Sequence, residues 1–392
     1  MRLQLRGDVL DGALCGDAQV RWSGDRAPTR DGACWRWTRD LSAHRAEGGW
    51  RVPLSVAIPR SRWVDPDARV TVTADAERPL RVSGPWGADG ESDPSLFVWE
   101  GYVVVAPFSP RALRAAGCAL NVAPVGATAG VDDGALDRWL GGAARAVASL
   151  YGRFPGTRLQ AVLLPGPPER GVAFGLSSRG GGGSVLFVVD PGARDLSGDW
   201  VATHEFVHLG QPVLDGEDAW FREGLATYYQ EVLRARVGLQ SPEAAWRNLA
   251  AGMRNVDGDG TGRDLAGEAE AMPRTGAWRR VYWTGAALAL GLDLALRRDP
   301  TAPTDLDEVS RAMHALSTRS PLRAWTLDAL RERLASSAFD RAWAAVVVPA
   351  LRGGSPPPWR ASLRGLGVDP ESGAIDDRAP GAAIRRAITS RR

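Results

Sequence analysis

Lysine is missing from this sequence of 392 residues, so all 48 of its basic residues are arginine. Without lysine the protein has no side chain for Schiff-base chemistry and none for the phosphate-binding loops that require one. The 46 acidic residues leave a formal net charge of only +2. A chain so nearly neutral has no strong net field to attract nucleic acid or an anionic membrane, and we expect no nucleic-acid partner.

Histidine and cysteine are also scarce. The chain has four histidines, His44, His204, His208 and His314, and three cysteines, Cys15, Cys34 and Cys118. So few cysteines exclude a cysteine-rich zinc module. A disulfide framework is not expected, and for Cys15 and Cys34 two alternatives stay open: one bridge in an exported protein, or two free thiols. A metal site therefore has few ways to be built from this sequence.

Long apolar runs are absent as well. No stretch approaches the ~18 uninterrupted apolar residues of a membrane-spanning helix, so no membrane span is expected. The segment 1–12 lacks the apolar core of a secretory signal, which makes a cytoplasmic location the default expectation; an exported form would need a leader that this sequence does not show. With 44% hydrophobic and 24% charged residues, the composition is that of a core-forming protein. Nothing in it indicates an oligomeric state.

The first third of the chain is strand-like. Short β-rich runs, bounded by proline, glycine and aspartate, lie at 50–58, 68–74, 79–83 and 96–107. This pattern is typical of antiparallel β structure and predicts a β-sandwich-like N-terminal domain over residues 1–125.

Helical spacing dominates after that boundary. A helix is expected at 134–152, two buried strands at 159–164 and 184–189, and mainly helices from there to about residue 350. The fold class is therefore α+β, with a mostly helical domain containing a small sheet over residues 126–350. Residues 351–392 are expected to form a C-terminal tail or small appended segment.

One segment carries a metal-binding pattern. Residues 204–208 read His204-Glu205-Phe206-Val207-His208. On a helix, positions i and i+4 share a face, so both imidazoles can reach one metal ion, and Glu205 can project toward a water molecule beside it. The alternative is an ordinary helix that happens to carry two histidines and a glutamate.

A second segment supplies a third ligand. Asp218 is expected to cap a new helix that ends near Gly238, and Glu223 lies in its first turns. If this helix packs antiparallel to the histidine helix, Glu223 reaches the pair, and Thr227 on the same face can hydrogen-bond a ligand. The alternative for Glu223 is a solvated carboxylate at a helix start. Further along, Tyr282 opens a long apolar helix and can donate its hydroxyl to an oxyanion.

Together these segments resemble the gluzincin metallopeptidases, in particular the glycyl aminopeptidase family and more distantly the aminopeptidase N family. Those families place a Trp-Phe/Leu-x-Glu-Gly segment after the His-Glu-x-x-His helix, and residues 220–229 match it. The later Val-Tyr-x-Lys-Gly-Ala segment corresponds to residues 281–286, with Thr284 in place of lysine. The resemblance covers roughly residues 135–300 and implies a thermolysin-like zinc peptidase domain. It implies zinc ligands His204, His208 and Glu223, the general base Glu205, and Tyr282 at the oxyanion.

The resemblance also has gaps. The interval between the histidine pair and Glu223 is a few residues shorter than in aminopeptidase N relatives. The glutamate that binds a substrate's free amine in those families has no counterpart in the corresponding stretch 180–187. Aminopeptidase and endopeptidase specificity therefore both stay open.

The mechanism implied is zinc-dependent hydrolysis of a peptide or protein substrate. Zinc lowers the pKa of a bound water toward ~7, Glu205 takes its proton and returns it to the leaving amine, and Tyr282 stabilises the oxyanion. We expect the strand 184–189 to bind an extended peptide at the sheet edge. Two alternatives remain: a zinc hydrolase of a non-peptide bond, and a catalytically silent binding or scaffold protein on the same fold.

Overall fold

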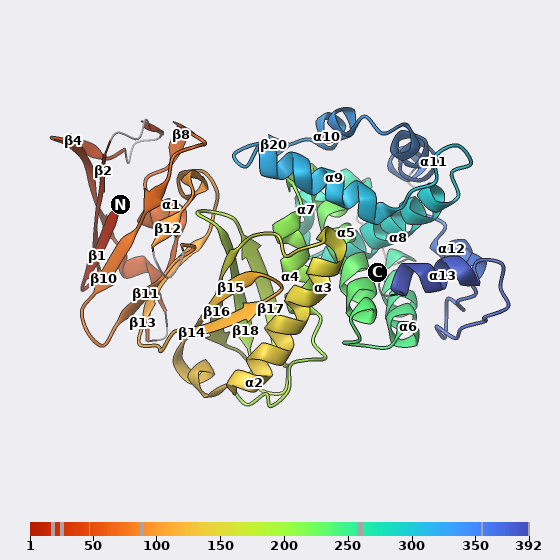
Figure 1. The fold of residues 1–392 in the computed structure, drawn as a ribbon, viewed down its shortest axis with the longest axis horizontal. Helices are drawn as coiled ribbons and strands as arrows, with labels where there is room; N and C mark the ends of the chain where they lie inside the picture. The colour runs from red at the N-terminus through yellow and green to blue at the C-terminus, as the bar shows by residue number, and fades with distance from the viewer. Residues whose placement is uncertain are drawn as a thin grey trace. The chain divides into compact units, whose positions relative to one another are not determined.

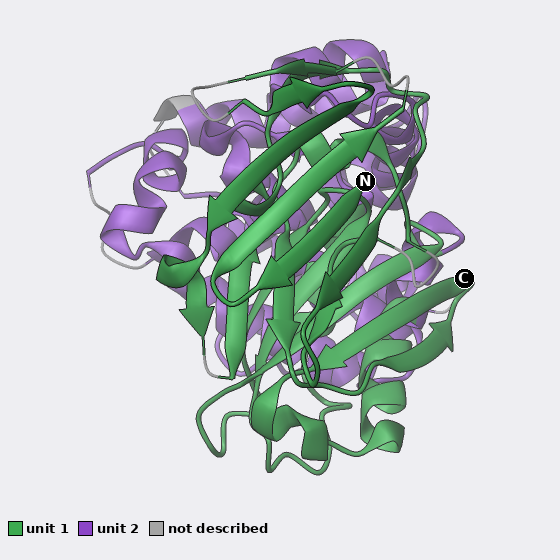
Figure 2. Ribbon diagram, turned by 90° about the vertical axis from the view of Figure 1, so that its left-hand side faces the viewer, with its two compact units in different colours: residues 1–144, 154–209 green, residues 145–153, 210–392 purple. Residues whose placement is uncertain are grey.

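The computed structural model describes residues 1–16, 20–23, 27–46, 48–86, 90–257, 262–353 and 356–390. The chain forms two compact units (Figure 2). Unit 1 comprises Met1–Ala144 and Phe154–Leu209, and unit 2 comprises Arg145–Arg153 and Gly210–Arg392. The domain boundaries expected at residues 125 and 350 were inferred from changes in sequence pattern, whereas the two units are defined by compactness. The expected boundaries therefore stay predictions. No helix within the described ranges is both long and apolar enough to cross a membrane.

The N-terminal part of unit 1 is built from β-sheets (Figure 1). One sheet has the strand order β10 (Thr73–Ala76), β1 (Arg2–Arg6), β2 (Val9–Cys15), β5 (Cys34–Asp40) and β4 (Thr29–Asp31). Its side chains alternate, with Leu3 and Leu5 buried and their neighbours more exposed, as a sheet with one covered face requires. Cys15 and Cys34 are cross-strand partners in β2 and β5 and form a disulfide.

A second sheet contains strands from three of the runs that the sequence predicts to be β-rich. Its order is β11 (Arg81–Ser83), β13 (Tyr102–Ala106), β7 (Gly49–Pro53) and β6 (Arg45–Ala46). The strand expected at 50–58 stops at Pro53, where the short helix α1 (Leu54–Ala57) begins. The run at 96–107 also starts differently, because a 3₁₀ turn, Pro94–Phe97, precedes β13. These strands confirm the β-rich character of the N-terminal part.

A five-stranded sheet completes unit 1. Its order is β14 (Arg111–Ala115), β15 (Cys118–Pro124), β16 (Arg158–Pro165), β18 (Gly183–Val189) and β17 (Val172–Ser178). The three central strands run parallel to one another, while β14 and β17 are antiparallel to their neighbours. Because β15 pairs with β16, the sheet takes strands from both sides of residue 125.

The expectation that the strand 184–189 forms the sheet edge is wrong. This strand, β18, has hydrogen-bonded neighbours on both sides, β16 and β17. The edge belongs to β17, which the sequence reading missed. An interior strand covered on both faces reads as a continuous apolar run, as β18 does, whereas small residues separate the apolar residues of β17.

Helical segments of unit 1 pack on this sheet, since the ring of Trp139 is 4.8 Å from that of Phe187 in β18. The region predicted to be helical at 134–152 contains α2 (Asp133–Leu136), a π-helical turn over 137–141, and α3 (Gly142–Tyr151). The helix α4 (Val201–Gly210) packs through Phe206, whose ring is 5.4 Å from that of Phe154 and 6.3 Å from that of Phe187 in β18. Aromatic packing on a central strand therefore anchors α4 to the sheet.

Unit 2 is mostly helical around α5 (Ala219–Arg236), most of whose side chains are buried. The helix α8 (Trp278–Arg297) runs against α5, as expected of the long apolar helix. The other helices of unit 2 are α6 (Pro242–Met253), α7 (Leu265–Thr275), α9 (Leu306–Arg319), α10 (Leu327–Leu334), α11 (Ser337–Gly353), α12 (Trp359–Gly365) and α13 (Ala382–Thr389).

Buried charged groups tie these helices together. Arg236 of α5 and Asp307 of α9 form an ion pair of 2.7 Å with both side chains 1% exposed. Tyr228 of α5 donates a hydrogen bond of 2.8 Å to Asp293 of α8, and burial raises the pKa of both groups. Arg236 also donates to the carbonyl of Ile388 in α13. The segment expected to be a C-terminal tail or small appended segment therefore contacts α5 through Ile388.

The capping role expected of Asp218 is wrong. Its side chain makes no capping bond to α5, and its Oδ2 instead accepts from the backbone N–H of Leu327 at the start of α10, at 2.8 Å. Burial raises the pKa of Asp218, and the bond from Leu327 offsets part of that effect.

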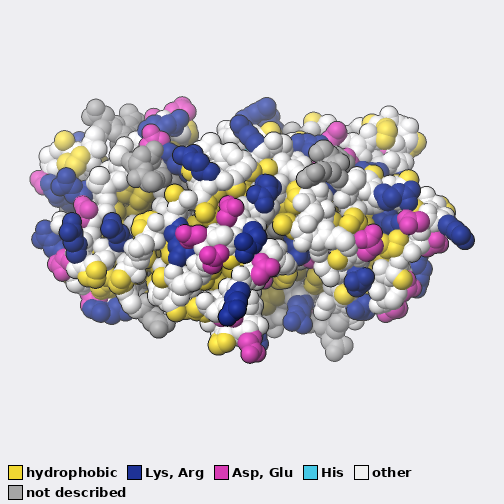
Figure 3. All heavy atoms as spheres, turned by 60° about the horizontal axis from the view of Figure 1, so that its bottom comes forward, with side chains coloured by type: hydrophobic (Ala, Val, Ile, Leu, Met, Phe, Trp, Pro, Cys, Tyr) yellow, Lys and Arg dark blue, Asp and Glu magenta, His cyan; other side chains and the backbone are white. Residues whose placement is uncertain are grey.

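Basic and acidic side chains are interspersed on the face shown in Figure 3, in keeping with the nearly neutral chain.

Candidate active site

The histidine pair sits on α4 as its spacing predicts. Asp199 accepts from the backbone N–H of Val201 at 2.8 Å and so supports the first turn of the helix. The Nε2 atoms of His204 and His208 lie 3.2 Å apart, and the residues are 3% and 7% exposed. The ring of Trp200, which is partly exposed, meets His204 edge-on at 5.6 Å. Two imidazole nitrogens thus converge on one point in a buried place.

Glu205 is held by the edge strand of the sheet. The backbone N–H of Ser177 in β17 donates to Glu205 Oε2 at 2.8 Å. Gly175 makes this approach possible, because a Cβ at that position would lie 2.7 Å from Cγ of Glu205. The hydrogen bond from Ser177 involves only Oε2 of Glu205 and does not involve Oε1. The sequence reading missed both β17 residues, and a glycine inside a strand was the signal that could have found them.

A second tie joins the edge strand to α4. Arg179 follows β17 directly, and its Nη2 donates to the backbone carbonyl of His208. A helix leaves its last carbonyl groups without intrahelical partners, and a guanidinium at that end satisfies one of them. The strand therefore contacts α4 at both the base and the second histidine.

Glu223 is buried, with 5% of its surface exposed, in the second turn of α5. Arg222, the residue before it, forms an ion pair with Glu223 Oε1 at 2.9 Å. The carbonyl of Arg222 accepts from Gln211 at 3.0 Å, which secures this turn of the chain. The pairing of Arg222 with the candidate ligand was not foreseen, because adjacent residues on a helix do not share a face.

His204, His208 and Glu223 each offer one ligand atom, and these atoms all lie within 4.8 Å of one another. Two imidazole nitrogens and one carboxylate oxygen are a donor set typical of catalytic zinc, which keeps a fourth position for water or substrate. The residues therefore fit a zinc ion. Thr227 does not make the orienting hydrogen bond expected of it, since its Oγ1 is buried without a partner among the described residues.

Tyr282 lies in the first turns of α8 and is half-buried, with the ring of Trp278 edge-on at 6.2 Å. It precedes Gly285 by three residues, and Gly285 lies against Gly224 of α5, the neighbour of Glu223. The two helices that carry Glu223 and Tyr282 are thus in backbone contact. The catalytic role of Tyr282 stays a prediction.

Solved structures of very different sequence share this fold. An aminopeptidase N family protein from Idiomarina loihiensis matches with a TM-score of 0.68 at 14% identity, covering 94% of this chain and 78% of that one. A mutant M1 zinc metallopeptidase from Deinococcus radiodurans, bound to a Tyr-Ser-Ala substrate, gives 0.55 at 15%, covering 91% and 94%. Native leukotriene A4 hydrolase from Saccharomyces cerevisiae gives 0.53 at 12%, covering 91% and 68%. No family model and no curated protein matches the sequence.

These likenesses concern the fold. They confirm the predicted α+β architecture, a β-rich N-terminal part followed by a mostly helical part, and its similarity to the zinc metallopeptidases named above.

Proposed function

We propose that this protein is a zinc-dependent peptidase whose ion is held by His204, His208 and Glu223. The observation that carries the proposal is the convergence of three buried ligand atoms within 4.8 Å, with Glu205 beside the first of them. A zinc ion in this place supplies Lewis acidity toward a scissile carbonyl and toward water.

Glu205 is the proposed general base. The N–H of Ser177 orients its carboxylate through one oxygen, which leaves the other oxygen to accept a proton from the attacking water. The same carboxyl group then returns the proton to the leaving amine. A carboxylate held by a backbone N–H loses little freedom on reaching its working geometry, and such positioning favours proton transfer.

Tyr282 is the proposed donor to the oxyanion. Its hydroxyl would stabilise the negative charge that develops on the carbonyl oxygen, an effect of roughly 2.7–4 kcal/mol for one donor in comparable sites. The contact of α8 with α5 at Gly285 and Gly224 supports a fixed position for the start of α8.

The proposed substrate is an extended peptide that pairs with β17. This strand has a sheet partner on one side only within the described chain, so its outer edge can accept a further strand. Its exposed side chains Phe174 and Leu176 favour apolar substrate residues. Neither β17 nor β18 contains an aspartate or glutamate to bind a free amine, which favours cleavage that does not depend on a free N-terminus.

The decisive experiment is hydrolysis of a peptide library by zinc-loaded protein, with every peptide present in free and N-acetylated form. Glu205→Gln should lower kcat by about 10²–10⁴-fold while keeping zinc, because it removes the base but no ligand. The matched control is Glu270→Gln, which changes an exposed carboxylate of α7 and should leave kcat unchanged. Equal activity of Glu205→Gln and the unmodified protein would contradict the proposed base.

The two forms of each peptide decide the specificity. Comparable rates on free and acetylated peptides are expected if no carboxylate recognises the amine. Cleavage restricted to free N-termini would show an aminopeptidase and contradict this part of the proposal. A protein that holds one zinc per chain but hydrolyses no peptide would favour the scaffold alternative.

A further inference from the structure

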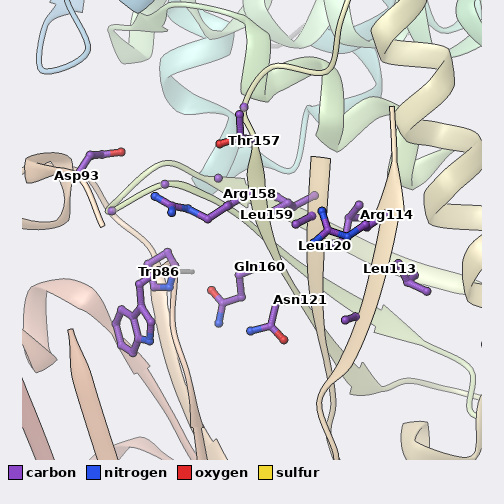
Figure 4. Close-up of a pocket in the computed structure, with 17 residues that line it drawn as sticks. Trp86, Asp93, Leu113, Arg114, Leu120, Asn121, Thr157, Arg158, Leu159 and Gln160 are labelled. Atoms are coloured by element: carbon purple, nitrogen blue, oxygen red, sulfur yellow. The ribbon is translucent and has the colours of Figure 1, made fainter. Parts of the chain in front are cut away.

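Unit 1 contains a cavity of about 380 Å³ that the proposed catalytic residues do not line (Figure 4). It lies where the parallel strands β15, β16 and β18 begin, at Ala119, Arg158 and Gly183. This volume is in the range of sites for small molecules, which are mostly apolar with a few convergent polar groups.

Two amide side chains enter this cavity from neighbouring strands. Asn121 of β15 and Gln160 of β16 are direct partners in the parallel ladder, so both project from the same face of the sheet. Figure 4 shows their amide groups side by side, with the indole of Trp86 next to Gln160.

These amides differ in what they bind. The amide of Gln160 donates to Ser83 at 2.9 Å and accepts from Ser184 at 2.6 Å, so it is held in place within the protein. Asn121 has no side-chain hydrogen bond to any described residue and is only partly buried. One amide is therefore fixed, and its neighbour is available to a ligand.

The charged residues of the cavity leave one guanidinium, that of Arg114, without an ion-pair partner among the described residues. Arg158 is paired with Glu91 at 2.6 Å, and Asp93 accepts from the backbone N–H of Ser95 at 2.8 Å. Arg114 of β14 is exposed and forms no ion pair with any described residue. An unpaired guanidinium beside apolar walls attracts an anion and binds a carboxylate through two parallel hydrogen bonds.

We propose that this cavity is a binding site for a small organic carboxylate with an apolar body. Its carboxylate pairs with Arg114, the amide of Asn121 provides a further hydrogen bond, and the apolar body lies against Trp86, Pro85 and Ala112, the last of which is the ladder partner of Asn121. This site is separate from the proposed peptidase centre and does not depend on it.

The test uses the full-length protein and isothermal titration with two matched probes, indole-3-acetate and its uncharged amide, indole-3-acetamide. The carboxylate should bind at least about tenfold more tightly than the amide, because only the carboxylate forms the ion pair. Raising the salt concentration should weaken the binding of the carboxylate, since Arg114 is exposed to solvent.

Variants locate the binding. Arg114→Gln should weaken indole-3-acetate about tenfold, and Asn121→Leu should weaken it as well. The matched control is Arg51→Gln, which changes an exposed arginine of β7 outside the cavity and should have no effect. Equal binding of the two probes, or carboxylate binding that survives Arg114→Gln (as it would at a zinc ion), overturns the proposal, as does the absence of carboxylate binding at millimolar concentration.

Discussion

The contact between α5 and α8 depends on two glycines, and Gly285→Ala tests it most directly. A Cβ on Gly285 would lie 2.1 Å from the carbonyl oxygen of Trp220 and 2.7 Å from Cα of Gly224. Both atoms belong to the backbone of α5, so no side chain can rotate away. To restore ordinary contact at about 3.5 Å, the helices must separate by about 1.4 Å at this crossing.

The cost follows from two opposing effects. Alanine stabilises a helix interior over glycine by ~0.8–1 kcal/mol. Overpacking a well-packed core costs ~1–3 kcal/mol, and a clash with backbone on both sides belongs at the upper end of that range. We therefore expect a net destabilisation of ~2 kcal/mol. For a unit of this size that loss corresponds to a fall in Tm of about 4–8 °C.

The assay is thermal unfolding of unit 2, together with kcat on a cleaved peptide. The variant should also lower kcat, since Glu223 adjoins Gly224 and Tyr282 lies one turn before Gly285. Gly365→Ala is the control, because a Cβ there meets nothing within 4 Å at the end of α12. If Gly285→Ala left Tm unchanged, or raised it as the control can, the backbone contact would not have the importance assigned to it.

Three further results are expected. Reduction of the Cys15–Cys34 bridge, or its replacement by two serines, should destabilise unit 1 by about 3 kcal/mol, the loop-closure value for a separation of 19 residues. Urea unfolding measures this loss, and an unchanged free energy of unfolding would contradict the prediction. Asp299 accepts bonds from Arg341 and its own loop, which hold the pKa of its carboxyl below the usual range. The stabilisation of the fold by the ionised Asp299 is thus present above the unfolded pKa of about 3.9 and is lost as the pH falls below it. Asp299→Asn should therefore lower Tm at pH 7, and the difference in Tm between variant and unmodified protein should shrink as the pH falls. A difference in Tm that does not change with pH would refute the pairing. His208→Ala should lose zinc in elemental analysis while an equivalent change at His44 keeps it, and zinc retained at one per chain would exclude His208 as a ligand.

Local patterns were enough to predict the parts of the site that lie on single helices. The four-residue spacing of His204 and His208 places both rings on one face of any helix, whatever surrounds it. Glu223 likewise lies in a helix, α5, where the sequence predicts one. These features depend on bonds within a few residues, and such bonds are specified by nearby sequence.

Features that depend on pairing between distant segments escaped prediction. The edge strand β17 alternates Val172, Phe174 and Leu176 with small residues, but glycine and alanine inside this short run lower its strand propensity, so the sequence reading passed over it. Its N–H at Ser177 meets Glu205 only because the sheet brings two segments 28 residues apart together. Asp218 likewise bonds to Leu327, far along the chain, rather than to the helix that it precedes.

The sequence by itself determined the helix that carries the histidine pair, the long apolar helix of Tyr282, and the donor types available for a metal, because residue spacing and composition are local properties. Only the tertiary structure decided which strand forms the sheet edge, which backbone N–H holds Glu205, and that the C-terminal segment packs against α5. It also brought Asn121, Gln160 and Arg114 together at one cavity. The reason is that hydrogen-bond partners, burial and cavities arise from strand register and helix packing, and these join residues whose separation along the chain carries no periodic signal.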